Sequence, residues 1–143
     1  MVGKVTPQLQ TRWTGQTEPE VHFAGLLPGE QIPELARSAH LFYAADLHPA
    51  CPNSVIEALA CGLPVVAFDT GAIPELVTGD SGRVAPYGAD PWKLEPPDIG
   101  SLARLALDIL QDQERFRGGA RARAEAGLDL DSMVQGYLEV LLG

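Results

Sequence analysis

The sequence contains only two cysteines among 143 residues, Cys51 and Cys61. Two cysteines at this spacing form neither a disulfide framework nor a CxxC metal pair, so both are expected to be free thiols in a reducing compartment. Long hydrophobic runs are also missing. None approaches the ~20 residues that a bilayer-spanning helix needs, and no charged segment with an apolar core opens the chain. These absences predict a cytoplasmic protein without a transmembrane segment.

Basic residues are scarce as well. Ten lysines and arginines stand against nineteen aspartates and glutamates, which gives a formal net charge of −9. This sign is opposite to the basic surface that neutralises nucleic-acid phosphates or anionic lipids, so neither is an expected partner. The sequence holds no GxGxxG or GxxxxGK loop, no Ser-His-Asp order and no cluster of metal ligands. We therefore expect no metal and no cofactor.

What the sequence does contain is an alternation of short apolar runs and helical patterns from Val21 onward. The predicted strands cover residues 21–23, 40–45, 63–68 and 82–85, and the helices between them cover residues 32–39, 53–60 and a short segment from Pro74. Strands alternating with helices through short connections predict an α/β fold, in which a Rossmann-like parallel sheet is flanked by helices.

The length predicts one domain with four segments. Residues 1–20 are a poorly patterned N-terminal segment with at most a short strand at Val2–Val5, and residues 21–87 form the α/β core. Residues 88–100 are a Pro/Gly linker, and residues 101–143 are a helical tail of the same domain. The arginines at 115, 117, 121 and 123 alternate with glutamates and are expected on a solvated helix face.

Ligands of open parallel sheets bind beyond the carboxyl ends of the strands, which here lead into residues 46–51 and 69–74. The helix from Asn53 follows the first of these segments, and its unpaired first-turn amides favour an anion such as a phosphate. Glu57, one turn further, suits hydrogen bonds from ligand hydroxyls. The spacing by itself favours a capping box with Ser54, in which each side chain covers the other's backbone amide.

Two further residues have a functional and a structural interpretation. Glu75 follows Pro74 at a helix start, where any carboxylate is favoured by the helix dipole. His48 ends a strand and could bind a sugar or a phosphate, although a histidine beside a proline is also typical of an ordinary loop.

Two blocks carry a resemblance to a known family: NSVIEALACGLPVVA at residues 53–67 and DTGAIPELV at residues 69–77. Together with VHFAGLLP at 21–28 and RVAP at 83–86, they resemble the carboxyl-terminal, donor-binding domain of family 4 retaining GT-B glycosyltransferases. The resemblance covers most of the chain from Val21. It implies half of a GT-B fold and transfer of a hexose from a nucleoside-diphosphate sugar with retention, without a required metal.

The resemblance also implies roles for individual residues. Glu57 matches the second glutamate of the family's E-x7-E motif, which binds the ribose of the donor. The first glutamate, which contacts the donor sugar, would fall at Pro49 and is absent. Because Pro52 has no amide, anion contacts would shift to the amides of Asn53, Ser54 and Val55. The donor-binding candidates are therefore Glu57, Asn53, Ser54, Val55, Gly71, Glu75 and His48, and no catalytic residue is identified.

Other features separate this chain from a complete enzyme of the family. Arg37 is the only basic residue between Trp13 and Gly82, so the basic pair that neutralises the donor diphosphate has no counterpart, and 143 residues leave no room for an acceptor-binding domain. The predicted function is nucleotide-sugar binding by a truncated transferase domain, inactive alone, whose partner would be an acceptor-binding domain or subunit. The alternatives are a non-catalytic remnant, a subunit of a split transferase, or a flavodoxin-like signalling or interaction domain.

Overall fold

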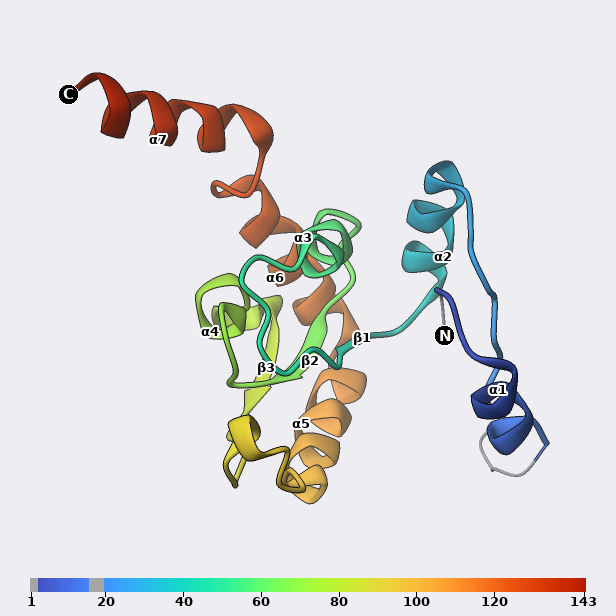
Figure 1. Ribbon diagram of the computed structural model, residues 1–143. Coiled ribbons are helices and arrows are strands. Elements are labelled where there is room, and N and C mark those ends of the chain that lie inside the picture. The colour runs from blue at the N-terminus through green and yellow to red at the C-terminus, as the bar shows by residue number, and fades with distance from the viewer. Residues whose placement is uncertain (1–2, 16–19) are drawn as a thin grey trace. The chain divides into compact units, whose positions relative to one another are not determined.

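The computed structural model describes residues 3–15 and 20–143 (Figure 1). The chain divides into two compact units, Met1–Leu35 and Ala36–Gly143. The first unit contains α1 (Pro7–Trp13), η1 (Gly29–Gln31) and the start of α2 (Ile32–Ser38). The predicted sheet and its ligand-binding edge belong to the second unit.

The first unit differs from the sequence prediction. Helix α1 was not expected, although Thr6 accepts a hydrogen bond from the amide of Leu9 and Pro7 occupies the first turn, which are both N-terminal helix signals. The predicted strand at residues 21–23 is wrong, because no strand is assigned there and a strand needs a hydrogen-bonded neighbour. The Gly3 amide instead bonds the nearby Gly25 carbonyl. Of the predicted strand at Val2–Val5, Val2 lies outside the described residues and residues 3–5 form none.

The second unit is built on a parallel sheet of three strands, β1 (Phe42–Ala44), β2 (Val65–Phe68) and β3 (Gly82–Ala85), in that order. Helix α3 (Asn53–Ala60) connects β1 to β2, and α4 (Ile73–Leu76) with η2 (Gly79–Ser81) connects β2 to β3. Every residue of central β2 is buried. The α/β architecture predicted from the alternation is confirmed, with three of the four predicted strands present.

Side chains of β2 alternate between two cores, one on each face of the sheet. Val65 and Ala67 pack with α3 and α4, whereas Val66 and Phe68 pack with residues of α5 (Ile99–Gln111). Helix α6 (Gln113–Glu125) contributes to both, with Phe116 in the second core and Ala120 in the first. The continuous apolar run at residues 40–45 is typical of a strand covered on both faces, but Tyr43 is half exposed because β1 is an edge strand.

Three α-helices follow the sheet, and an aspartate caps each. Asp98 accepts from the amide of Ser101 at the start of α5, and Asp112 does the same for Arg115 in α6. Asp129 caps α7 (Leu130–Leu142) through Ser132. The predicted helical tail is therefore present, but α5 starts at Ile99, inside the segment predicted as a linker. That segment also contains the short helix η3 (Pro91–Lys93).

The arginines of α6 do not form the solvated face that the charge pattern predicted. Arg117 donates to the carbonyls of Arg37 and Ala39, and Arg121 donates to the carbonyl of Ala60 at the end of α3. Arg123 donates to the carbonyls of Glu75 and Leu76 at the end of α4. The last carbonyls of a helix lack intrahelical partners, and guanidinium groups from another element satisfy them here.

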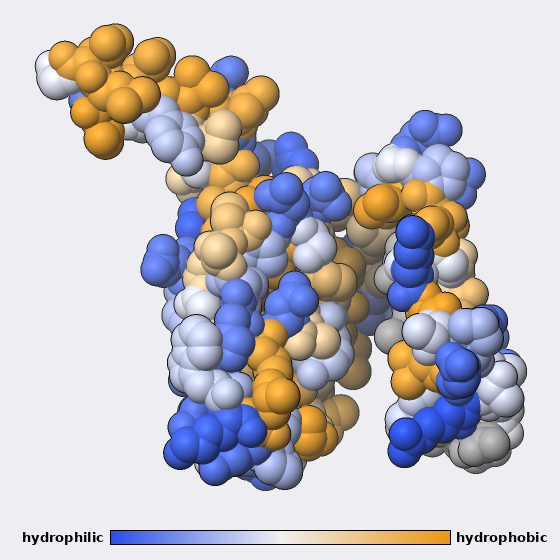
Figure 2. Space-filling model, in the orientation of Figure 1, coloured by the Kyte–Doolittle hydropathy of each residue, from blue (hydrophilic) through white to orange (hydrophobic). Residues whose placement is uncertain are grey.

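Helix α7 is apolar but carries no buried residue. Figure 2 shows its side chains as a largely hydrophobic surface. Tyr137 is 64% exposed and Leu141 is 75% exposed, although their spacing places both on the apolar face of an amphipathic helix. Among the described residues, no helix is both long and apolar enough to cross a membrane.

Candidate functional site

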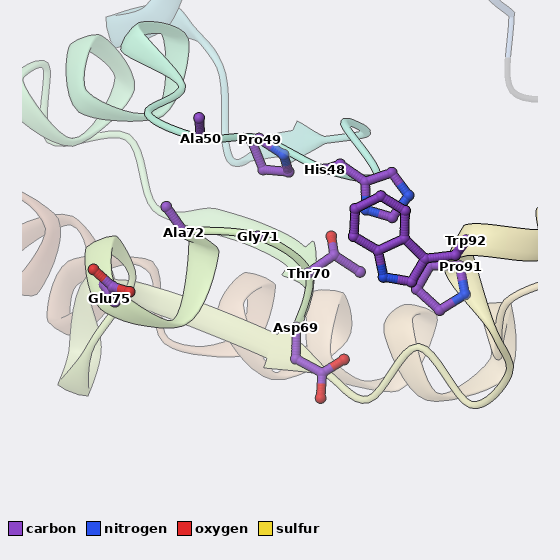
Figure 3. Close-up of a pocket in the computed structure, with 10 residues that line it drawn as sticks. All are labelled: His48, Pro49, Ala50, Asp69, Thr70, Gly71, Ala72, Glu75, Pro91 and Trp92. Carbon is purple, nitrogen blue, oxygen red and sulfur yellow. The ribbon is translucent and has the colours of Figure 1, made fainter.

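A pocket of about 500 Å³ opens where β1 and β2 end, at the edge of the sheet where parallel-sheet proteins bind ligands. Three segments contribute to it: the loop after β1, the loop after β2 with the start of α4, and η3 (Figure 3). The lining residues are His48, Pro49, Ala50, Asp69, Thr70, Gly71, Ala72, Glu75, Pro91 and Trp92. The loops predicted as ligand-binding from strand order therefore meet in one cavity.

The two strand-end loops are joined by hydrogen bonds. The Ala72 amide donates to the carbonyl of Pro49 at 2.8 Å, and the Thr70 hydroxyl donates to the carbonyl of Asp46 at 3.3 Å. Gly71 has φ of 53°, and a Cβ there would collide with the carbonyl and ring of Pro49. Only glycine fits this approach, so Gly71 fixes the shape of the pocket floor.

The pocket is acidic. Asp69 and Glu75 line it, whereas no lysine or arginine of the described chain does. One oxygen of the Asp69 carboxylate accepts from the amide of Tyr87 at 2.8 Å, which ties the end of β2 to the segment after β3. Glu75 is exposed, and no side-chain hydrogen bond or ion pair of this carboxylate is found within residues 3–15 and 20–143. Glu75 is thus available to a ligand, while Asp69 also has a structural role.

An aromatic pair closes one end of the pocket. The rings of His48 and Trp92 stack with centroids 3.8 Å apart and planes 15° apart, as Figure 3 shows. His48 therefore has a packing partner that its sequence context did not reveal. Trp92 nevertheless remains 79% exposed, which is unusual for an indole at the rim of a cavity.

The start of α3 differs from the capping box that the sequence offered. The N-cap is Pro52, and no side chain of the described residues caps this helix end. The Val55 amide donates to the carbonyl of Pro52 at 3.0 Å and is therefore already used. Asn53 and Ser54 carry the first-turn amides that remain for an anion. Because the capping box is not formed, the exposed carboxylate of Glu57 is left without that structural explanation.

The predicted site residues fall into two groups. His48, Gly71 and Glu75 line the pocket. Asn53, Ser54, Val55 and Glu57 lie on the first turns of α3, which begins three residues after the pocket residue Ala50. Sequence reasoning missed Trp92, because a Pro-rich segment far along the chain gave no sign of folding back onto the loop after β1. Within the described chain, no group of three or more His, Cys, Asp or Glu side chains could hold a metal ion.

These features define an α/β domain with a ligand pocket at the carboxyl edge of a parallel sheet. Comparison with known proteins then identifies its family. The family model described as "Glycosyl transferases group 1" matches residues 1–112, and the chain belongs to this family. An O-antigen chain mannosyltransferase B of Escherichia coli is 31% identical over 112 residues, which cover 78% of this chain and 26% of the relative. A 2-deoxystreptamine N-acetyl-D-glucosaminyltransferase of Streptomyces fradiae is 30% identical over 95 residues, which cover 66% of this chain and 21% of the relative.

Solved structures show the same fold. Anabaena Alr3699/HepE in complex with UDP matches with a TM-score of 0.74 and 24% identity, over 98% of this chain and 39% of that chain. The sucrose-phosphate synthase of Thermosynechococcus elongatus matches with a TM-score of 0.73 and 22% identity, over 99% of this chain and 37% of that chain. The domain therefore has the α/β fold of GT-B glycosyltransferases. The chain spans about a quarter of the length of the curated relatives it matches.

Proposed function

We propose that this domain binds the nucleoside-diphosphate sugar donor of a glycosyltransferase. The observation that carries the proposal is the pocket at the ends of β1 and β2, in a chain of the group 1 glycosyltransferase family. It is supported by the similar Anabaena protein, whose structures contain UDP and UDP-glucose. A flavodoxin-like signalling or interaction domain has no comparable support, because the family match and these structure matches are to glycosyltransferases.

The donor's charged and hydroxyl-bearing parts would meet different groups of α3. The amides of Asn53 and Ser54 would donate to a phosphate, because they lie at the positive end of the helix dipole. Glu57, one turn further and exposed, would accept hydrogen bonds from the ribose hydroxyls, as the family resemblance implies. In the transferase reaction these amides would stabilise the charge that develops on the departing diphosphate. No metal or cofactor is required by this arrangement.

Transfer itself needs an acceptor held beside the donor's anomeric carbon. We propose that an acceptor-binding domain or a separate subunit supplies this second wall, and that hexosyl transfer then proceeds with retention in a reducing, cytoplasmic compartment. The 143-residue chain alone should show negligible transfer, since none of its side chains is assigned as a catalytic group. Radiolabelled product from the isolated chain, with UDP-glucose or GDP-mannose and any sugar acceptor, would refute this.

Calorimetric titration tests donor binding directly. UDP, GDP, ADP and their sugar conjugates are titrated into the wild-type chain, Glu57→Ala and Glu139→Ala. The last variant removes another exposed carboxylate, on α7, and serves as the control for charge. Loss of charged hydrogen bonds to Glu57 should weaken binding of one nucleotide by about tenfold to a hundredfold. Equal affinity of the Glu57→Ala and Glu139→Ala variants would reject the ribose contact.

One observation favours a second candidate, a non-catalytic domain of the same ancestry. Pro49 occupies the position where the resemblance places the sugar-binding glutamate, and its carbonyl is bonded to the Ala72 amide. Absence of binding by every nucleotide at millimolar concentration, with the chain folded, would favour that candidate over donor binding.

A further inference from the structure

The lining of the pocket has a chemistry of its own, distinct from that of the α3 terminus. It combines the carboxylates of Asp69 and Glu75 with the indole of Trp92, and no cationic side chain of the described chain borders it. Carboxylates repel a diphosphate and accept hydrogen bonds from neutral hydroxyl groups. The pocket therefore favours an uncharged ring that carries hydroxyls.

Trp92 adds a flat apolar surface to these acceptors. His48 stacks on one face of the indole, and the residue is still 79% exposed, so a second face is open. The faces of a hexose ring present C–H groups, whereas its hydroxyls point outward around the ring. A hexose can therefore lie against an indole face and leave its hydroxyls free for hydrogen bonds, which a phosphate group cannot do.

Trp92 is held in place by its own segment. The Asp90 carboxylate accepts from the Trp92 amide at 3.0 Å, and Lys93 pairs with the same carboxylate at 3.1 Å. The Tyr87 hydroxyl donates to the carbonyl of Glu95 at 2.7 Å, and Tyr87 is buried. The exposed indole thus stands on an anchored turn, which fixes a binding surface before any ligand arrives.

We propose that Trp92, backed by His48, is the residue that recognises the sugar of the donor, with Glu75 as a hydroxyl acceptor in the same pocket. This inference rests on the proposed function and assigns the sugar moiety to the pocket and the diphosphate to α3. A sugar ring that covers roughly 50 Å² of apolar indole surface gains about tenfold in affinity. That gain belongs to the sugar conjugate alone and is absent for the bare nucleotide.

The experiment measures the affinity ratio between UDP-glucose and UDP, and between GDP-mannose and GDP, for wild type and for Trp92→Ala, Trp92→Phe and Tyr137→Ala. Tyr137 is an exposed aromatic residue of α7 that does not line the pocket, and it controls for loss of an aromatic ring. Trp92→Ala should abolish the roughly tenfold advantage of the conjugate and leave UDP or GDP affinity unchanged. Trp92→Phe should retain part of the advantage. Because Trp92 is exposed, these variants should fold, and circular dichroism checks this.

A second readout observes the indole itself. The chain has two tryptophans, so a Trp13→Phe background leaves Trp92 as the only one. UDP-glucose or GDP-mannose should then change the tryptophan fluorescence, and the corresponding diphosphate should not.

The outcomes separate the two proposals. If the diphosphate binds but the conjugate gains nothing, or if Trp92→Ala weakens both ligands equally, the sugar assignment is overturned while donor-site binding stands. If neither diphosphates nor conjugates bind, the proposed function fails, and the sugar assignment fails with it.

Discussion

The close approach of α6 to η2 gives a prediction with a built-in control. Gly118 and Gly119 are adjacent in the middle of α6, and their surroundings differ. A Cβ at Gly119 would collide with the backbone carbonyl of Asp80 and lie 2.8 Å from its Cβ, whereas a Cβ at Gly118 would meet nothing within 4 Å. The same substitution to alanine therefore tests packing at one residue and only helix propensity at the other.

The two substitutions should change the free energy of unfolding by different amounts. Replacing a mid-helix glycine with alanine raises helix stability by about 1 kcal/mol, so Gly118→Ala should be more stable than wild type. Gly119→Ala gains the same term, but forcing a methyl group against backbone costs about 1–3 kcal/mol. That overpacking term is the expected difference between the two variants, with Gly118→Ala the more stable.

Urea unfolding followed by circular dichroism measures this difference. The m-value of a small protein in urea is about 1–3 kcal/mol per molar, so the expected difference in the free energy of unfolding corresponds to a difference of roughly 1 M between the two urea midpoints. If Gly118→Ala and Gly119→Ala unfold at the same urea concentration, the close packing of α6 on Asp80 is refuted.

Three further predictions concern the loops, the arginines and the helix caps. Gly71→Ala should destabilise the chain by more than Gly79→Ala in thermal unfolding, because both glycines have positive φ but only Gly71 lies against Pro49; equal losses would reject the contact. Arg123→Met should lower the free energy of unfolding by about 1–3 kcal/mol, because the carbonyls of Glu75 and Leu76 lose their donor. Arg104→Met should lower it by less, because Arg104 donates a described hydrogen bond only to the Ser101 hydroxyl. Denaturant titration of both variants measures the two losses, and equal losses would reject the role of Arg123. Hydrogen bonds from the Ser101 and Ser132 hydroxyls lower the pKa of Asp98 and Asp129, so the stabilisation by these caps is present above the ordinary aspartate pKa and is lost as the pH falls through the lowered pKa. The helicity of the double variant Asp98→Asn plus Asp129→Asn should therefore fall less on acidification than that of wild type. Parallel acid profiles of the two proteins would contradict this prediction.

The sequence predicted the part of the fold that local patterns encode. The apolar run of β2, the helix at residues 53–60 and the strand at Gly82–Ala85 each carry their own signal, and the structure confirms them. The strand at residues 21–23 failed because a strand depends on a partner that no local pattern specifies. The carboxyl ends of parallel strands lie at one edge of a sheet, so the meeting of the loops after β1 and β2 was also predictable.

The remainder depends on contacts between distant residues. Ser54 and Glu57 fit a capping-box pattern, yet Pro52 takes the N-cap position and the box does not form. The charge pattern predicted that the arginines of α6 face solvent. Arg117 and Arg123 instead donate to backbone carbonyls, and every residue type has such a carbonyl, so the sequence does not indicate these partners. Trp92 reaches His48 across more than forty residues, and composition indicates only that its segment is irregular.

The hydrogen bond from the Ala72 amide to the Pro49 carbonyl ties the loop after β2 to the loop after β1, so the two loops should move together. A proline ring restricts the backbone on one side, and a glycine that no other residue can replace sits opposite it. A ligand entering here has little chain to order, so its binding should lose little conformational entropy. The same stiffness has an evolutionary consequence. A substitution in either loop must be accommodated by the other, so new ligand specificities should arise more readily at the exposed Trp92 turn than in these two loops.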